Sequence, residues 1–216
     1  MEPKIIFLVI LGVVSVVYLV TLFFKYGLFQ AILKGCLVPF VLAVYIFGAE
    51  KILLPIVLAL VFGWVGDVLL LKGSDFRFFI MGLVSFLIGH ICYIIAMYEF
   101  ARPFHITVLV ISIAVGACIG LLLFKILRPT AEMKIPIIAY EITIITMAIF
   151  ALQLFLTQNF SFGVFVLGGS LCFLVSDSTL AFDSFRKKLK YGAFIIMLTY
   201  IAAQLLITLG FCNAGV

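Results

Sequence analysis

Long apolar runs, broken at short intervals by charged residues, prolines and glycines, fill almost the whole chain. A helix that crosses a membrane needs about 20 consecutive, mostly apolar residues. Eight segments approach this length, and the connections between them are too short to hold a soluble domain. The pattern therefore predicts an all-α fold, a polytopic transmembrane bundle of about eight helices in a single integral membrane domain over residues 1–216. The predicted spans are 5–24, 30–48, 52–71, 78–98, 104–124, 135–156, 160–182 and 191–212.

The composition agrees with this class. The chain is 67% hydrophobic and 11% charged, whereas soluble domains are about 50% apolar and about 25% charged. The first run follows a weakly basic "MEPK" and lacks a small-residue cleavage pattern, so we interpret it as a retained helix rather than a signal peptide. The five cysteines are scattered singly, which favours core residues over a disulfide framework or a zinc knuckle.

Basic residues are distributed unevenly between the two ends of the predicted spans. Eleven of the fourteen lysines and arginines fall at the odd-numbered connections, and only Lys4, Lys51 and Arg102 fall at the other end. This asymmetry predicts odd loops in the cytoplasm and both termini outside or luminal, in a bacterial inner membrane or an endomembrane. The positive charge, densest in "RKKLK" (186–190), therefore indicates topology and contact with anionic membrane lipids rather than nucleic acid.

Two similar stretches hint at an internal duplication. "GDVLLLKGSDFR" (66–77) ends the third span, and "SDSTLAFDSFR" (176–186) ends the seventh. Both have Asp, then Leu three residues later, then Phe-Arg. Because four spans separate them, the two stretches would have the same orientation, as in a parallel 4+4 repeat. Similar constraints at helix ends are the alternative explanation.

Each stretch contains an aspartate within the apolar run, where a charged side chain costs on the order of 3 kcal/mol. Asp67 lies five residues before Lys72 and Asp177 six before Asp183, about 7.5 Å and 9 Å from the same membrane edge. A single such aspartate could simply be a solvated residue at a helix end. This explanation is weaker for two aspartates at matched depth on different helices. Small neighbours would let helices approach closely and a substrate reach the carboxylates; these are Gly63, Gly66, Ser176 and Ser178. We therefore predict that Asp67 and Asp177 are catalytic, with Ser176 among the substrate-binding residues.

Three further polar residues begin spans at the same end. Lys34 either extends its ammonium group to the interface or supplies a cation to the aspartates or to a lipid phosphate. Tyr140 and Glu141 are adjacent, and adjacent helix positions point about 100° apart, so we do not expect both to face one pocket. We favour Tyr140 as the hydrogen-bond donor in the site and Glu141 as the partner of an interfacial lysine.

His90 lies thirteen residues beyond Arg77, about 20 Å from the membrane edge and about 10 Å deeper than the aspartates. With Tyr93, which shares its helix face, it is expected to line a deeper part of the pocket; a buried structural histidine is the alternative. A zinc site would need three or four ligands around one centre. Only two histidines exist and His105 is at the opposite end, so no metal and no cofactor are predicted.

The blocks "GWVGDVLLL", "FLIGHICYI", "YEITIITM" and "GGSLCFLVSDSTLAF" resemble, in this order and spacing, the YhhN-like lysoplasmalogenase family. The resemblance covers nearly the whole chain. Lys34 also fits the family pattern, although Gly35 follows it where the family has proline. The resemblance implies an ether hydrolase that cleaves the sn-1 vinyl ether bond of choline or ethanolamine lysoplasmalogens. The products would be a fatty aldehyde and glycerophosphocholine or glycerophosphoethanolamine.

This chemistry would use a pair of carboxylates. Hydrolysis begins when the β-carbon of the vinyl ether is protonated, and water then attacks the resulting oxocarbenium ion, as in glycoside hydrolysis. One aspartic acid would donate the proton, and the other aspartate would stabilise the cation and activate water. Two alternatives remain: a proton-coupled transporter of small molecules or lipids, and a zinc-dependent ester or amide lipid hydrolase.

Overall fold

The computed structural model describes residues 2–24, 27–73, 75–101 and 103–214. Lys25 and Arg102, two of the basic residues counted above, lie outside these ranges. In the described ranges the chain forms eight α-helices and a short 3-10 helix, η1 (Ala131–Met133). The α-helices are α1 (Pro3–Thr21), α2 (Gly27–Gly48), α3 (Leu54–Leu70), α4 (Phe76–Phe100), α5 (Ile106–Leu127), α6 (Lys134–Thr157), α7 (Phe160–Phe185) and α8 (Gly192–Cys212).

The predicted bundle is confirmed, and each predicted span begins and ends within three residues of its helix. Of the helices in the described ranges, seven are long and apolar enough to cross a membrane. The shorter one is α3, with 17 residues. It is the helix that carries Asp67.

Local sequence signals mark several helix starts. Asp75 caps α4 by accepting a 2.9 Å hydrogen bond from the backbone N–H of Arg77. Asn159 caps α7 in the same way, from the N–H of Phe162 at 2.8 Å. Proline occupies the first turn of α1 and of α3, where its missing N–H leaves no hydrogen bond unmade.

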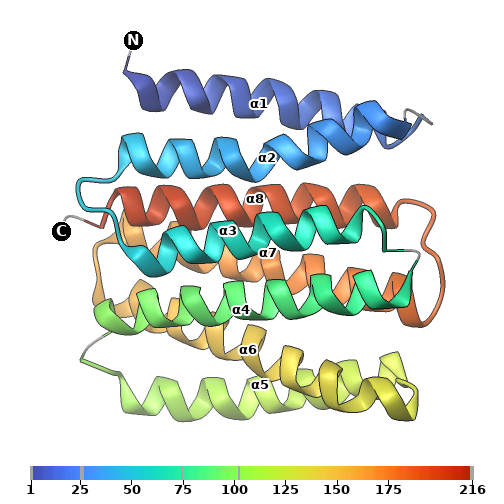
Figure 1. Cartoon of the computed structure of the whole chain (residues 1–216). Coiled ribbons are helices and arrows are strands. Elements are labelled where there is room, and N and C mark those ends of the chain that lie inside the picture. The colour runs from blue at the N-terminus through green and yellow to red at the C-terminus, as the bar shows by residue number, and fades with distance from the viewer. Residues whose placement is uncertain (1, 25–26, 74, 102, 215–216) are drawn as a thin grey trace.

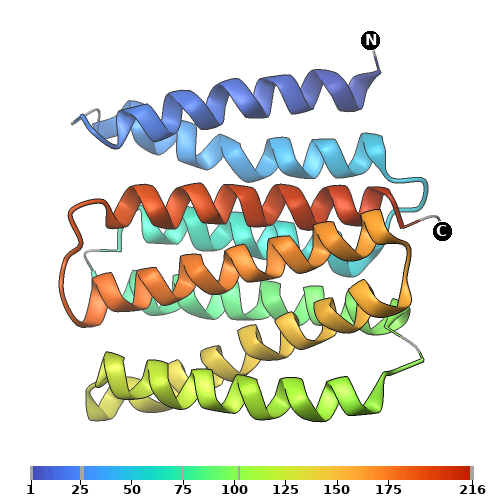
Figure 2. The ribbon, with the colours of Figure 1, turned by 180° about the vertical axis from the view of Figure 1, so that it is seen from behind.

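Six helices form a closed ring in which each packs against the next, in the order α2, α3, α4, α6, α7, α8 and back to α2. The remaining two lie outside the ring: α1 packs mainly on α2, and α5 mainly on α6 (Figures 1 and 2). Both termini lie at one end of the bundle. The connections after α1, α3, α5 and α7 lie at the other end, which we call the basic end because it carries most of the lysines and arginines.

The packing order is the one expected of a parallel 4+4 repeat. If α1–α4 correspond to α5–α8, the contact between α4 and α6 corresponds to that between α8 and α2, and both are present. The outer helices α1 and α5 correspond as well. The ring therefore brings α3 and α7, which carry the two aspartates, to related positions in the two halves.

Candidate active site

Asp67 lies in the last turn of α3 and is buried, with 2% of its surface exposed. Its Oδ2 accepts a hydrogen bond of 2.7 Å from the hydroxyl of Tyr200 on α8. Its Oδ1 lies 3.3 Å from Nζ of Lys34 on α2, an ion pair in which the lysine side chain is 13% exposed. Lys34 thus provides a cation to Asp67, one of the two roles expected for it.

The Tyr200 hydroxyl continues into a chain of hydrogen bonds. It accepts one of 3.1 Å from Nε2 of Gln204, whose Oε1 accepts one of 2.5 Å from the Tyr93 hydroxyl. Gly63 makes room for this chain, since a Cβ there would lie 2.7 Å from Nε2 of Gln204. We call Lys34, Asp67, Tyr93, Tyr200 and Gln204 the Asp67 cluster.

Asp177 lies on α7 in a second group of polar side chains. Its Oδ2 accepts a hydrogen bond of 2.7 Å from the hydroxyl of Tyr140 on α6. Nε2 of His90 on α4 lies 3.6 Å from the same oxygen, beyond hydrogen-bond distance, and pairs with its charge only if the imidazole is protonated. His90 is buried against the rings of Tyr140 and Phe173, with centroids 5.5 Å and 4.8 Å away. We call His90, Tyr140 and Asp177 the Asp177 cluster.

The prediction that His90 lies about 10 Å deeper than the aspartates is wrong for Asp177, because the imidazole of His90 lies next to the Asp177 carboxyl group. Side chains of an α-helix lean toward its N-terminus. Since α4 begins at the basic end and α7 begins at the opposite end (Figure 1), the His90 side chain leans outward and that of Asp177 leans inward. The two side chains therefore meet although their helix positions differ in depth.

The ring of Phe173 separates the two clusters. Its centroid lies 4.8 Å from that of His90, 6.0 Å from that of Tyr93 and 5.8 Å from that of Tyr200. Tyr200 holds Asp67, and His90 contacts Asp177. The clusters are thus joined through aromatic packing, while no hydrogen bond between them is found in the described residues.

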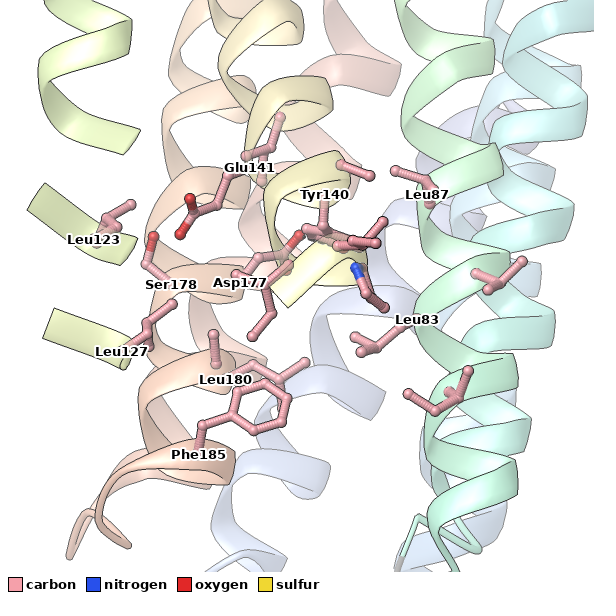
Figure 3. Close-up of a pocket in the computed structure, with 18 of the residues that line it drawn as sticks. Leu83, Leu87, Leu123, Leu127, Tyr140, Glu141, Asp177, Ser178, Leu180 and Phe185 are labelled. Atoms are coloured by element: carbon pink, nitrogen blue, oxygen red, sulfur yellow. Dashed lines mark hydrogen bonds between the residues drawn. The ribbon is translucent and has the colours of Figure 1, made fainter. Parts of the chain in front are cut away.

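A pocket of about 250 Å³ opens between α4, α5, α6 and α7 and is lined almost wholly by apolar side chains. Its polar lining residues are Tyr140, Glu141, Asp177 and Ser178. Figure 3 shows these four side chains at one level of the pocket, with Leu123 and Leu127 of α5 on one side and Leu83 and Leu87 of α4 on the other. One member of the predicted catalytic pair, Asp177, therefore faces a cavity suited to an apolar chain.

The prediction that Tyr140 and Glu141 do not share a pocket is wrong. The pocket wraps around α6 from its α4 side to its α5 side, wide enough to include side chains about 100° apart. No lysine pairs with Glu141 in the described part of the chain. Its Oε1 is instead buried without a hydrogen-bond partner there.

The other predicted site residues lie behind the pocket wall. Asp67, Lys34, His90 and Tyr93 are absent from the lining. Ser176 is buried and donates a hydrogen bond of 3.1 Å to the backbone carbonyl of Ile196, which ties α7 to α8. Among the predicted substrate-binding residues, Tyr140 alone lines the pocket.

Tyr200 and Gln204 belong to the Asp67 cluster but were not predicted from the sequence. The signal was present in "YIAAQ" (200–204), where two hydrogen-bonding residues four apart share one face of an apolar helix. A polar pair on one face inside a membrane span indicates a partner within the bundle.

Potential metal ligands do not gather in the described residues, where no three His, Cys, Asp or Glu side chains are placed to hold an ion. The five cysteines are free and dispersed. Cys92 and Cys212 are buried as expected of core residues, whereas Cys118 is exposed. The polar groups that do gather are the two carboxylates with their lysine, tyrosine and histidine neighbours.

Comparison with known proteins identifies a family and a curated relative. Residues 26–211 match the model of the YhhN family. The chain is 36% identical over 151 residues to Lysoplasmalogenase TMEM86B of Homo sapiens, in an alignment that covers 70% of this chain and 60% of that protein. The chain thus spans about 60% of the length of this curated relative. No solved structure matches it.

Proposed function

The chain belongs to the YhhN family, and from this premise we propose that it is a lysoplasmalogenase. It would hydrolyse the sn-1 vinyl ether bond of a choline or ethanolamine lysoplasmalogen to a fatty aldehyde and the glycerophosphodiester. The name of the human relative supports this activity. The observation that carries the proposal is a carboxyl group, Asp177, on the wall of an apolar pocket in a membrane-embedded bundle.

We assign the acid to Asp177. No lysine or arginine pairs with its carboxyl group in the described residues, and the Tyr140 hydroxyl bonded to it is uncharged. An ionised carboxylate in apolar surroundings is costly without a cation, so these surroundings favour the protonated acid. That acid would give its proton to the β-carbon of the vinyl ether. This leaves an oxocarbenium ion, whose positive charge is shared by the α-carbon and the sn-1 oxygen.

We assign the permanent anion to Asp67. The Lys34 ammonium and the Tyr200 hydroxyl both stabilise a negative charge on it. Held behind the pocket wall, this charge would stabilise the developing cation electrostatically. Water would then attack the cation and pass a proton to the Asp177 carboxylate, which restores the acid. The resulting hemiacetal breaks down to the aldehyde and the glycerol hydroxyl.

The remaining predicted site residues receive supporting roles. Tyr140 would hold Asp177 in place, and His90 beside it would help to return the proton. Lys34, Tyr93 and Ser176 would maintain the position of the two carboxyl groups through the contacts described above.

The substrate would lie with its alkenyl chain in the pocket and its phosphate toward the basic end. This arrangement fits a basic end that faces the cytoplasm and termini that lie outside or in a lumen. Reporter fusions at the C-terminus and near Lys188 test the orientation. A cytoplasmic C-terminus would contradict it.

Product analysis tests the activity. Purified protein given a lysoplasmalogen should release aldehyde, and given the 1-acyl analogue it should release no fatty acid. In heavy water, with the aldehyde reduced at once, one deuterium should appear on the carbon next to the former carbonyl. Aldehyde without that label would contradict acid catalysis, fatty acid from the analogue would indicate an ester hydrolase, and substrate movement without products a transporter.

A further inference from the structure

Glu141 contributes a carboxyl group to the pocket that the mechanism above does not use. It follows Tyr140 on α6 and shares the lining with Asp177, Ser178 and apolar side chains of α5. Its Oε1 is buried and has no hydrogen-bond partner in the described residues. A buried acceptor without a donor is unfavourable, and since Glu141 lines the pocket, rotation of its carboxyl group would turn this oxygen toward a donor carried by the pocket's occupant.

The position of Glu141 restricts which donor this is. Figure 3 shows its carboxyl group beside Ser178, on the side of the pocket toward Leu123 and at about the level of Asp177. If Asp177 protonates the vinyl ether, groups near Glu141 belong to the glycerol carbons next to that ether. The ammonium of the headgroup lies beyond the phosphate, toward the basic end. The donor nearest the ether in a lysoplasmalogen is the free sn-2 hydroxyl.

We propose that Glu141 accepts a hydrogen bond from the sn-2 hydroxyl of the substrate and thereby selects lysophospholipids over lipids acylated at sn-2. This inference rests on the proposed function, since it places the ether at Asp177. An sn-2 ester has no proton to donate, so it would leave the Glu141 oxygen unpaired. Sites built to bond a substrate hydroxyl reject analogues without it far more strongly than apolar pockets do.

Binding of a ligand that cannot be hydrolysed tests this selection separately from catalysis. The probes are a saturated 1-O-alkyl lysophosphocholine and its sn-2-deoxy analogue, each displacing a fluorescent lysophospholipid from detergent-purified protein. Wild type should bind the hydroxyl compound about threefold to tenfold more tightly, the range for a hydrogen bond to an uncharged acceptor. Glu141→Leu should bind both compounds as wild type binds the deoxy analogue.

Two variants serve as controls. Glu99→Leu makes the same change at an exposed position of α4 outside the pocket lining and should keep the wild-type ratio. Glu141→Gln keeps an uncharged carbonyl acceptor, so its ratio should stay close to that of wild type. If Glu141→Leu does not fold, Glu141→Ala takes its place, and an unchanged ratio in that variant would overturn the proposal.

Other outcomes separate this proposal from the proposed function. Equal binding of the two compounds by wild type, or a ratio that Glu141→Leu leaves intact, would overturn the role of Glu141. A normal ratio in a protein that forms no aldehyde would support hydroxyl recognition and contradict the hydrolase. If Glu141→Leu lowers aldehyde formation as much as Asp177→Asn without changing the ratio, Glu141 transfers protons and does not recognise the hydroxyl.

Discussion

The Asp67 and Asp177 clusters have the same construction and different chemistry. Each aspartate receives one group from the preceding helix, Lys34 from α2 or Tyr140 from α6. Each receives a second group from the last helix of the other half, Tyr200 from α8 or His90 from α4. His90 follows Asp67, and Tyr200 follows Asp177, by the same 23 residues. This exchange between halves is what a parallel duplication predicts.

The differences lie in charge and in access. Asp67 has a cation and is sealed inside the bundle, whereas Asp177 has an uncharged hydroxyl and faces a pocket. The outer helices explain the access: α1 buries four side chains, including Leu11 and Tyr18, whereas α5 buries only Gly116 and Leu127. One half thus packs tightly and holds an anion, and the loosely covered half leaves room for a substrate beside an acid.

The largest expected effect is on the accessible aspartate. Asp177→Asn keeps the shape and the bond from Tyr140 but removes the acid, so kcat should fall about 1,000-fold, within the range for general acid–base groups. Aldehyde release by purified protein measures it, and an unchanged melting temperature shows that folding is intact. Near-normal turnover in this variant would remove Asp177 from catalysis.

The sealed aspartate should matter less. Asp67→Asn removes an anion behind the wall and not the proton donor, so we expect a loss of about 100-fold, the low end of that range. The ratio of the two losses, measured on one substrate, tests whether the clusters differ as proposed. A greater loss for Asp67 than for Asp177 would reverse the assignment of acid and anion.

Lys34 tests the ion pair through stability. Lys34→Met leaves the buried Asp67 charge unpaired and should lower the free energy of unfolding by about 3 kcal/mol. Combining it with Asp67→Asn should restore most of this stability without restoring activity. If the double variant is no more stable than Lys34→Met, the ammonium does not neutralise Asp67.

The fold could be predicted from the sequence because the membrane imposes span length and keeps charges at the ends. The candidate site was predictable only in part. Asp67 and Asp177 could be identified because a carboxylate is costly in an apolar run. Tyr200 lies 133 residues from the aspartate it contacts, and hydropathy contains no information on that pairing. The predicted depth of His90 was wrong because it was counted along the helix axis, and the direction in which the side chains lean was ignored.

His90→Gln asks whether the neighbour of the acid takes part in proton return. Glutamine retains a hydrogen-bonding side chain but does not titrate, so kcat should fall about tenfold, less than for either aspartate. The melting temperature should fall as well, because the buried imidazole packs on the rings of Tyr140 and Phe173, so kcat is measured below the transition of the variant. A loss equal to that of Asp177→Asn would place His90 among the groups that contact the substrate.

The smallest effects should come from Tyr140 and Tyr200, the two residues that occupy the most similar positions in the two clusters. Tyr140 and Tyr200 each donate a 2.7 Å hydrogen bond to the Oδ2 of their aspartate. Replacing either with Phe removes the same hydroxyl, so differences between the variants report the surroundings. Tyr200 also accepts a hydrogen bond from Gln204. Removing its hydroxyl leaves the buried Asp67 anion without one donor and the Gln204 amide without its acceptor. Tyr200→Phe should therefore destabilise the protein by about 2 kcal/mol with a small change in kcat.

Tyr140→Phe, beside the pocket, should lower kcat about threefold to tenfold. It should barely change the melting temperature, since a hydrogen bond between two neutral groups contributes only about 1 kcal/mol. Equal losses of stability in the two variants would mean that both aspartates are held in the same charge state.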